Sequence, residues 1–455
     1  MVSQNWSDIA LLHRRAGFGL RPDELDRLAA GTYESAVDGL VAGLASAPDP
    51  GASHIAAPDV SLPPRPAKGD IAAIKAYNRQ LQVEMTALQS WWIDKMIATS
   101  TPLREKLTLF WHGHFATAFS KVRDPKLMYL QNQLFRQVGG GSFETLTQAV
   151  AKDGAMMFWL DTVVNKKAHP NENFGREMME LFTLGLGNYT QDDVVAAARG
   201  FTGWSYNRKT YEYVFQRAQH DFGSKTYLGQ TGDWNGTDIV HIAVTRPASA
   251  RFVLAKLWSH FAYPVTPADP VVGDLLAAYG TGMDITAALK AIFMHPNFTS
   301  ATTRTGLVKQ PVEYLVSAAR ALGLDSKMSR TAPGVSAPPA TPAQKQARRP
   351  TLTVLAKLLG QTVFDPPNVG GWGQNTYWLD TVTARLRFEA ALLLAESGDL
   401  TAVSSVPPSQ RVAAAATMLG LDGWGPTTAS ALAQLNTDPV ALVALALTSP
   451  EYVLA

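Results

Sequence analysis

The chain has 455 residues, with 40 Lys and Arg against 38 Asp and Glu, a formal net charge of +2, and no cysteine. The charged fraction is 17%, below the roughly 25% of ordinary domains, so no strong field gathers polyanions and a dedicated nucleic-acid-binding protein is not expected. The lack of cysteine excludes disulfides, thiolate zinc sites, iron–sulfur clusters and a cysteine nucleophile, so any bound metal needs His, Asp or Glu ligands.

The N-terminus reads MVSQNWSDIALLHRRAGFG. It lacks the basic start, apolar stretch and small-residue cleavage site of a secretory signal, although a signal that has been removed leaves no trace. No run approaches 18 apolar residues, so no membrane span is expected. We therefore expect a soluble chain that is cytoplasmic as its sequence stands.

Apolar residues recur at helical spacing through most of the chain, and strand-like alternation is scarce, which predicts a mainly α protein. The longest helix is expected over 70–99, and the next begins after Thr101, with Pro102 at its first position. Further helices are expected near 125–138, 142–151, 172–184, 191–200, 247–263, 267–279, 284–294, 305–323, 351–359, 378–397, 408–419, 428–437 and 438–448.

The clearest strand signal lies in 210–229, where TYEYVF and KTYLG are expected to pair as a small β-ribbon inserted into the helical fold. The stretches 45–69 and 325–350 are rich in Pro and Ala and are expected to be long irregular segments.

No fixed-period repeat is present, so a solenoid is not supported. We expect one large multi-helix domain over 1–400, with the site motifs in 70–400. The Ala- and Leu-rich residues 401–455 are expected to add packing helices.

The first candidate for chemistry is the segment LTLFWHGHFATAFSK, in which His112 and His114 lie among aromatic residues. Residues two apart on a helix diverge by about 200°. Gly113 allows the helix to end there, however, and both imidazoles then converge on a metal or a substrate. The alternative is two histidines packed under aromatic rings, each satisfied by a backbone carbonyl.

The second candidate is NENFGREMMELF, which places Asn173, Arg176, Glu177 and Glu180 on one face of a regular helix. Glu177 and Glu180 then lie one turn apart with Arg176 beside them. Adjacent carboxylates with an arginine suit general acid–base catalysis or binding of a divalent cation. The alternative is a solvated face with an Arg176–Glu180 ion pair.

Other acidic residues nearby receive simpler interpretations. Thr190 with Asp193 predicts a capping box that opens the next helix. Asp153 predicts a helix N-cap, whereas Asp161, which follows the apolar run MMFWL, is the better site candidate.

The third and fourth candidates lie on irregular segments. His220 and Asp221 in QHDFGSKTYLG can supply a ligand or a base, or form a surface turn. The run DPPNVGGW is a loop because two prolines and two glycines break any helix. It presents Trp372 and Asn368, an aromatic face and a neutral amide suited to a sugar, or it is a buried structural loop.

Two weaker signals concern basic residues. Lys309 and Glu313 are four apart and predict an ion pair. The run HRR at 13–15, which precedes two glycines, is a weak signal for anion binding because no strand precedes it.

Taken together, these motifs resemble a bacterial family named "domain of unknown function 1800". The resemblance runs in order from about residue 8 to 390 and includes LLHRRAGFG, REKLTLFWHGHFAT, MMFWLD, NENFGREMMELFTLGLGNYTQDDV, RGFTGW, HDFGSKTYLG, VKQPVEYL and GQTVFDPPNVGGW. The family's characteristic positions fall here on His112, His114, Asp161, Asn171, Glu172, Asn173, Arg176, Glu177, Glu180, His220, Asp221, Pro367, Asn368, Gly371 and Trp372.

The family's name records that no general activity is settled. Similar members are often exported and often encoded beside a sulfatase-like protein, which implies an extracytoplasmic task and a sulfatase-like companion. The lack of a signal peptide in this chain departs from the exported members.

Three functions remain open, and the leading one is a hydrolase acting on a carbohydrate-like substrate. Glu177 or Glu180 is then the proton donor, and Asp161 or the other glutamate is the base. The orienting and substrate-binding residues are Arg176, Asn173 and Trp372.

The second is a metal-dependent hydrolase or oxidase with a divalent or transition metal on His112, His114 and Glu177 or His220. The third is a non-catalytic protein that binds a glycan or a partner through the loop of Asn368 and Trp372. A small-molecule or glycan ligand is expected in each case.

Overall fold

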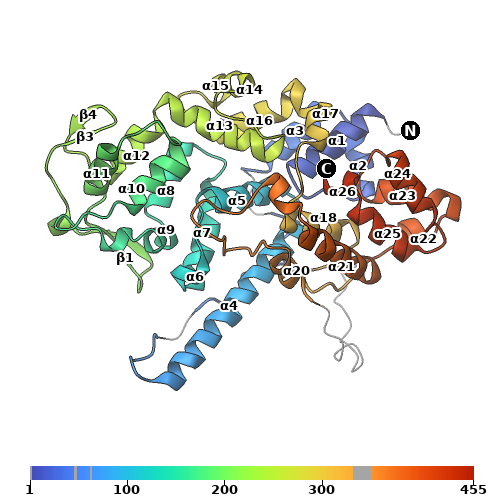
Figure 1. The fold of residues 1–455 in the computed structure, drawn as a ribbon, viewed down its shortest axis with the longest axis horizontal. Coiled ribbons are helices and arrows are strands. Elements are labelled where there is room, and N and C mark those ends of the chain that lie inside the picture. Colours follow the sequence, from blue (N-terminus) through green and yellow to red (C-terminus); the bar gives the residue numbers. More distant parts are fainter. Residues whose placement is uncertain (1–2, 46–48, 62–63, 331–349, 455) are drawn as a thin grey trace.

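The computed structural model describes residues 3–45, 49–61, 64–330 and 350–454. Within these residues the chain is mainly α-helical, as the apolar spacing predicts, and it contains two small two-stranded sheets. Helix α4 (Ile71–Ala98) extends away from the body of the molecule (Figure 1). Among the described residues, no helix combines the length and the apolar character needed to cross a membrane.

The helices of the first 200 residues are α1 (Gln4–Arg15), α2 (Pro22–Ala29), α3 (Tyr33–Ala42), α4, α5 (Pro102–His114), α6 (Phe119–Val122), α7 (Pro125–Val138), α8 (Phe143–Ala151), α9 (Gly154–Trp159), η1 (Thr162–Val164), α10 (Asn173–Glu177), η2 (Met178–Thr183) and α11 (Gln191–Gly200).

The helices of the remaining chain are η3 (Arg217–Gln219), α12 (Gly236–Val244), α13 (Pro247–Phe261), α14 (Pro270–Asp274), α15 (Leu276–Tyr279), α16 (Ile285–Met294), η4 (Pro296–Thr299), α17 (Ala301–Thr305), α18 (Pro311–Ala321), α20 (Leu352–Leu358), η5 (Asn375–Trp378), α21 (Thr381–Ser397), α22 (Thr401–Ser404), α23 (Pro408–Met418), α24 (Pro426–Ala433), α25 (Pro439–Thr448) and α26 (Pro450–Val453).

A buried carboxylate fastens α4, α5 and α7 together. Glu105 on α5 accepts a hydrogen bond from the indole nitrogen of Trp92 on α4, at 2.9 Å. The same carboxylate accepts two bonds from Arg136 on α7, at 2.7 and 2.8 Å. Burial alone raises the pKa of Glu105, but the Arg136 guanidinium and these bonds outweigh it and lower the pKa. The three helices therefore share a buried, charge-compensated anchor.

Helix α5 lies between two apolar cores. The first core contains Trp111 of α5 with Phe143 of α8 and Leu257 of α13, all fully buried. The second contains Leu109 of α5 with Leu442 of α25 and other buried residues of α4, α18 and α21. The C-terminal end of α5 consequently lies where the two cores meet.

The strands pair differently from the expected ribbon. β2 (Glu212–Phe215) pairs with β1 (Trp204–Asn207), and β3 (Lys225–Tyr227) pairs with β4 (Gln230–Gly232). The expected pairing of TYEYVF with KTYLG is therefore wrong. Each strand pairs instead with its nearest neighbour along the chain, because short turns close local hairpins at little entropic cost.

The described parts of 45–69 contain no helix or strand, which confirms their irregular character. Most of the second Pro-rich stretch, residues 331–349, lies outside the described residues. Helix α21 packs against α25, and residues of α22 to α26 share the second core with α4. The division expected at residue 400 stays a prediction.

Candidate functional site

His112 occupies a structural position in the second core. Helix α5 continues to His114, one residue past Gly113, so the two imidazoles point in different directions. The ring of His112 packs 4.7 Å from Trp92, and Asn132 Nδ2 donates a 3.2 Å hydrogen bond to His112 Nε2. Burial, with a smaller effect from Arg136, lowers the pKa of His112 to about 3. This histidine is therefore a neutral, packed side chain.

His114 faces the other side of α5. Its Nε2 lies 2.9 Å from the carbonyl oxygen of Phe182, which can only accept, so Nε2 carries the proton and Nδ1 holds the lone pair. Nδ1 is buried and has no hydrogen-bond partner among the described residues. Burial, with help from Lys256, lowers the pKa of His114 well below its ordinary value. His114 is thus a neutral hydrogen-bond acceptor held by the carbonyl of Phe182.

The segment expected to be one regular helix over 172–184 changes geometry halfway. After α10, the chain forms a π-helix, η2, in which the backbone N–H of Leu184 donates to the carbonyl of Met179. The Thr183 hydroxyl donates a 2.7 Å hydrogen bond to the carbonyl of Met178. The expectation of a continuous α-helix is therefore wrong, and the spacing of 100° per residue does not apply beyond Met178. Single π-helical turns occur frequently at functional sites.

We call α10 and η2 together, residues 173–183, the carboxylate segment. Its carboxylates have different surroundings. Glu180 accepts a 2.6 Å hydrogen bond from the Tyr189 hydroxyl. Arg176 donates to Glu172 at 2.8 Å and to Gln191 at 2.9 Å, so the alternative of an Arg176–Glu180 ion pair is wrong.

The carboxyl group of Glu177 differs from those of its neighbours because it makes no hydrogen bond or ion pair within the described residues. The residue is neither fully buried nor fully exposed. Partial burial and then the Glu180 charge raise the pKa of Glu177, against a smaller lowering by Arg176. A carboxyl group with a raised pKa and no internal partner is available to donate a proton.

Asp161 lies beside the start of the same segment. It has a left-handed backbone, with φ of 61°, and its Oδ2 binds Lys121 Nζ at 2.9 Å and Asn173 Nδ2 at 3.2 Å. Lys121 also donates to the carbonyl of Trp159 at 2.5 Å. The structure therefore brings Asp161 and Asn173 together, with the Asp161 carboxylate already engaged.

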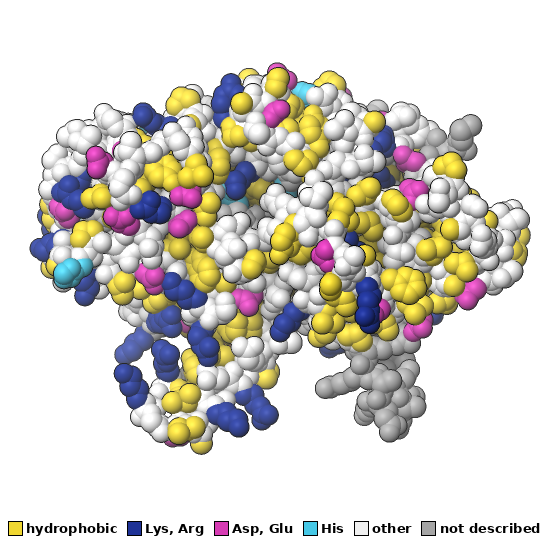
Figure 2. Space-filling model, in the orientation of Figure 1, with side chains coloured by type: hydrophobic (Ala, Val, Ile, Leu, Met, Phe, Trp, Pro, Cys, Tyr) yellow, Lys and Arg dark blue, Asp and Glu magenta, His cyan; other side chains and the backbone are white. Residues whose placement is uncertain are grey.

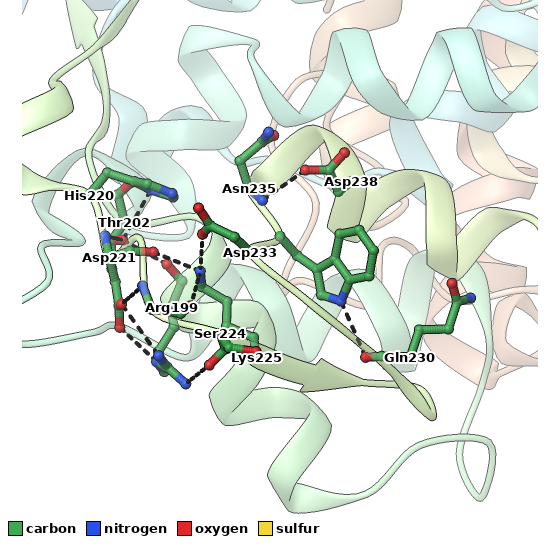
Figure 3. A network of polar contacts seen from close by, with 12 residues as sticks. Arg199, Thr202, His220, Asp221, Ser224, Lys225, Gln230, Asp233, Asn235 and Asp238 are labelled. Atoms are coloured by element: carbon green, nitrogen blue, oxygen red, sulfur yellow. Dashed lines mark hydrogen bonds and ion pairs between the residues drawn. The ribbon is translucent and has the colours of Figure 1, made fainter.

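His220 and Asp221 hold a structural network (Figure 3). Asp221 binds Arg199 of α11 through Nε at 2.6 Å and Nη2 at 3.3 Å, and that bond, before any other cause, lowers the pKa of Asp221. His220 Nδ1 lies 2.7 Å from the carbonyl of Thr202. Lys225 donates to the carbonyl of Asp221 at 2.6 Å. These contacts tie the β3–β4 hairpin to α11 and leave both predicted site residues with internal partners.

The loop DPPNVGGW packs against the end of α5. Trp372 is buried, with 7% of its surface exposed, so it is no open platform for a sugar ring. Asn368 is exposed and closes a turn by accepting a 2.8 Å bond from the backbone N–H of Gly370. Gly371 has φ of 87°, and a Cβ there would lie 2.2 Å from the carbonyl oxygen of Gly113.

We expect Gly371→Ala to lower the free energy of unfolding by at least about 2 kcal/mol, because it combines a left-handed backbone with a clash against helix backbone. Gly370→Ala is the matched control, since its nearest neighbour is the Asn368 side chain at 3.1 Å. Urea unfolding of both variants tests this expectation, which equal stabilities would contradict.

A small, partly open pocket lies at this junction of α5, α13 and the loop. Figure 2 shows a hollow in the middle of this face in which histidine side chains are visible. The residues that line the pocket are Leu109, Phe110, Gly113, His114, Lys256, His260, Gln310, Gly370, Trp372 and Gln374. We call it the central pocket.

Three buried nitrogens of the central pocket's lining residues have no hydrogen-bond partner among the described residues. They are His114 Nδ1, His260 Nε2 and Trp372 Nε1. Buried polar atoms are normally satisfied, so three unsatisfied nitrogens on residues around one pocket single it out as a candidate binding site. Lys256 and His260 were not predicted, because nothing in the spacing of α13 separates them from an ordinary helix; a histidine amid apolar residues is the one available signal.

The described residues contain no group of three or more His, Asp or Glu side chains that could hold a metal ion. His112 and His114 have separate surroundings, as their ring contacts show. The metal-dependent alternative with Glu177 stays a prediction.

Comparison with known proteins identifies a family for this chain. No curated protein and no solved structure is similar to the chain. The model of the family described as "Protein of unknown function (DUF1800)" matches residues 11–454, nearly the whole chain. The protein with this carboxylate segment and central pocket therefore belongs to the DUF1800 family.

Proposed function

We propose that this protein is a hydrolase that acts on a carbohydrate-like substrate, with Glu177 as the proton donor. The observation that carries the proposal is the state of Glu177, a carboxyl group with a raised pKa and no hydrogen bond or ion pair within the described residues. A raised pKa keeps more of the carboxyl protonated near neutral pH, which is what a general acid needs.

Glu180 supplies the second carboxylate. The Tyr189 hydroxyl fixes it at 2.6 Å, and burial together with Glu180 raises the pKa of Tyr189 to about 12, so Tyr189 remains the donor. An acidic proton donor beside an oriented carboxylate is the pair that glycoside hydrolysis requires. Asp161 is already engaged by Lys121 and Asn173, so we assign it to positioning rather than to the base.

A second candidate function is ligand binding without catalysis. The unpartnered nitrogens of His114 and Trp372 in the central pocket favour it. The pocket and the carboxylate segment are connected, because the Phe182 carbonyl of that segment holds His114. Binding without turnover would select this candidate.

A screen of soluble polysaccharides, read by release of reducing ends, tests the proposal. We expect hydrolysis of at least one glycan by the wild-type protein and its loss in Glu177→Gln. Binding of a glycan without hydrolysis, or hydrolysis that survives Glu177→Gln, would contradict the assignment.

A further inference from the structure

A second small pocket adjoins the central pocket and shares His260, Gln310 and Gln374 with it. We call it the basic pocket. Its other lining residues are Arg14, Arg15, Lys106, Ser259, Leu307, Val308, Lys309, Glu313 and Asn375.

Positive charge exceeds negative charge in this lining. Arg14, Arg15, Lys106 and Lys309 face the single carboxylate of Glu313. Isolated charges are costly to bury, so such an excess is unusual unless something compensates it.

Both oxygens of the Glu313 carboxylate are engaged, since its Oε2 accepts a 3.1 Å hydrogen bond from the backbone N–H of Gln310 and its Oε1 binds a lysine. Its Oε1 lies 2.5 Å from Lys106 Nζ, so the expected Lys309–Glu313 ion pair is wrong. The spacing rule fails because Lys309 precedes α18, which begins at Pro311, and its backbone N–H binds Val453 instead. Glu313 therefore does not neutralise Lys309 directly.

Lys309 is the least compensated cation. It is buried, with 5% exposed, and its ammonium makes no hydrogen bond or ion pair within the described residues. Its contact is the ring of Tyr452, whose centroid lies 3.6 Å from Nζ. Burial first, and then Arg14 and Arg15, lower the pKa of Lys309 well below its ordinary value.

The two arginines also keep unused donors. Arg14 binds the carbonyl of Gly420, and Arg15 binds the carbonyl of Thr303. The Nε of each guanidinium is buried without a partner among the described residues. Burial lowers the pKa of Arg14 to about 10 and that of Arg15 to about 9, so both guanidinium groups remain charged at neutral pH.

We propose that the basic pocket binds an oxyanion group, namely the sulfate, phosphate or carboxylate of a small ligand. Such a group accepts charge-assisted hydrogen bonds from Lys309 and from the arginines and offsets the excess positive charge. His260, Gln310 and Gln374 line both pockets, so the ligand's anionic group lies next to the central pocket. This inference does not depend on the role of Glu177.

Calorimetric titration with inorganic sulfate, inorganic phosphate and glucuronate, at constant ionic strength in chloride, tests the proposal. Preference for sulfate or phosphate identifies a tetrahedral anion, and preference for glucuronate identifies a carboxylate. We expect Lys309→Met to weaken binding about tenfold or more, since one charge-assisted bond is lost. In the absence of added anion, the same variant is expected to be at least as stable as the wild type, because a lysine whose pKa is lowered by folding costs stability below its ordinary pKa.

Lys95→Met is the matched control, because Lys95 also lies over an aromatic ring, 5.7 Å from the centroid of Trp91, and lines neither pocket. Arg14→Gln gives an independent second variant and is expected to weaken binding in the same way. Absence of binding by all three anions at millimolar concentration, or equal binding by wild type, Lys309→Met and Arg14→Gln, would overturn the proposal.

Discussion

Glu177→Gln is expected to lower kcat for the cleaved glycan by about 10²–10⁴-fold, the usual contribution of general acid–base catalysis. Glutamine keeps the size of the side chain but cannot give up a proton. The loss is expected in kcat more than in KM, since Glu177 acts on the leaving-group oxygen in the transition state. Initial rates of reducing-end release over a range of substrate concentrations measure both parameters.

Glu144→Gln is the control for this effect. Glu144 is a partly exposed carboxylate on α8 that binds His241 at 2.7 Å and makes no hydrogen bond with Glu177 or Glu180. It is expected to keep wild-type kcat. The folded stability of Glu177→Gln is expected to equal or exceed that of the wild type at neutral pH, because a raised pKa means that the ionised form of Glu177 costs stability in the folded state. A Glu177→Gln protein that is inactive only because it unfolds would contradict this assignment.

Acid is expected to destabilise the protein strongly, because four buried histidines are held neutral. Burial is the first cause in each case; it lowers the pKa of His13 and His260 to about 4 and that of His112 to about 3, and the pKa of His114 lies well below 6.5. As the pH falls below about 6.5, these histidines bind protons in the unfolded chain but stay neutral in the folded chain. Their stabilising contribution is therefore present above that pH and is lost as the pH falls towards about 4, at up to about 1.4 kcal/mol per pH unit for each histidine.

Asp153 opposes this trend. Burial raises its pKa to about 7, so the folded chain binds one proton there that the unfolded chain releases above about pH 4. The net slope is then at most that of about three groups, four histidines less one aspartate, because the raised pKa of Glu177 acts in the same direction as that of Asp153. Urea unfolding at several pH values between about 7.5 and 5 measures it.

His13→Leu provides an internal check on the acid prediction. Both ring nitrogens of His13 are buried without a hydrogen-bond partner among the described residues, so an apolar replacement leaves no group newly unsatisfied. This variant is expected to lose about one group's share of the slope. A free energy of unfolding that stays level between about pH 7.5 and 5 would contradict the account of neutral buried histidines.

Much of the fold follows from sequence patterns that act locally. The helix over 70–99 is recovered as α4, with Asp70 accepting a bond from the backbone N–H of Ala73. Thr190 and Asp193 form the predicted capping box, and Asp153 caps α9. These features depend on residues within one turn of each other, so they can be predicted from the sequence alone.

The candidate site was recovered less completely. At the π-helix the Thr183 hydroxyl donates to the carbonyl of Met178 and His114 of α5 donates to the carbonyl of Phe182, and neither contact can be seen in the spacing of the apolar residues. The basic pocket unites residues near 14, 106 and 309, which only the tertiary fold brings together. The run HRR at 13–15 contributes Arg14 and Arg15 to this lining, and the anion binding it weakly suggested stays a prediction. The sulfatase-like companion stays a prediction.

The most direct test of the central claim needs no substrate. The carboxyl carbon of Glu177 can be followed by NMR in protein labelled at glutamate, with Glu177→Gln used to assign its signal. The account predicts that Glu177 titrates above the ordinary glutamate pKa of 4.5 and that Glu180→Gln moves the pKa of Glu177 down, because the neighbouring negative charge is removed. A Glu177 signal that titrates at or below 4.5 and does not respond to Glu180→Gln would contradict its role as the proton donor.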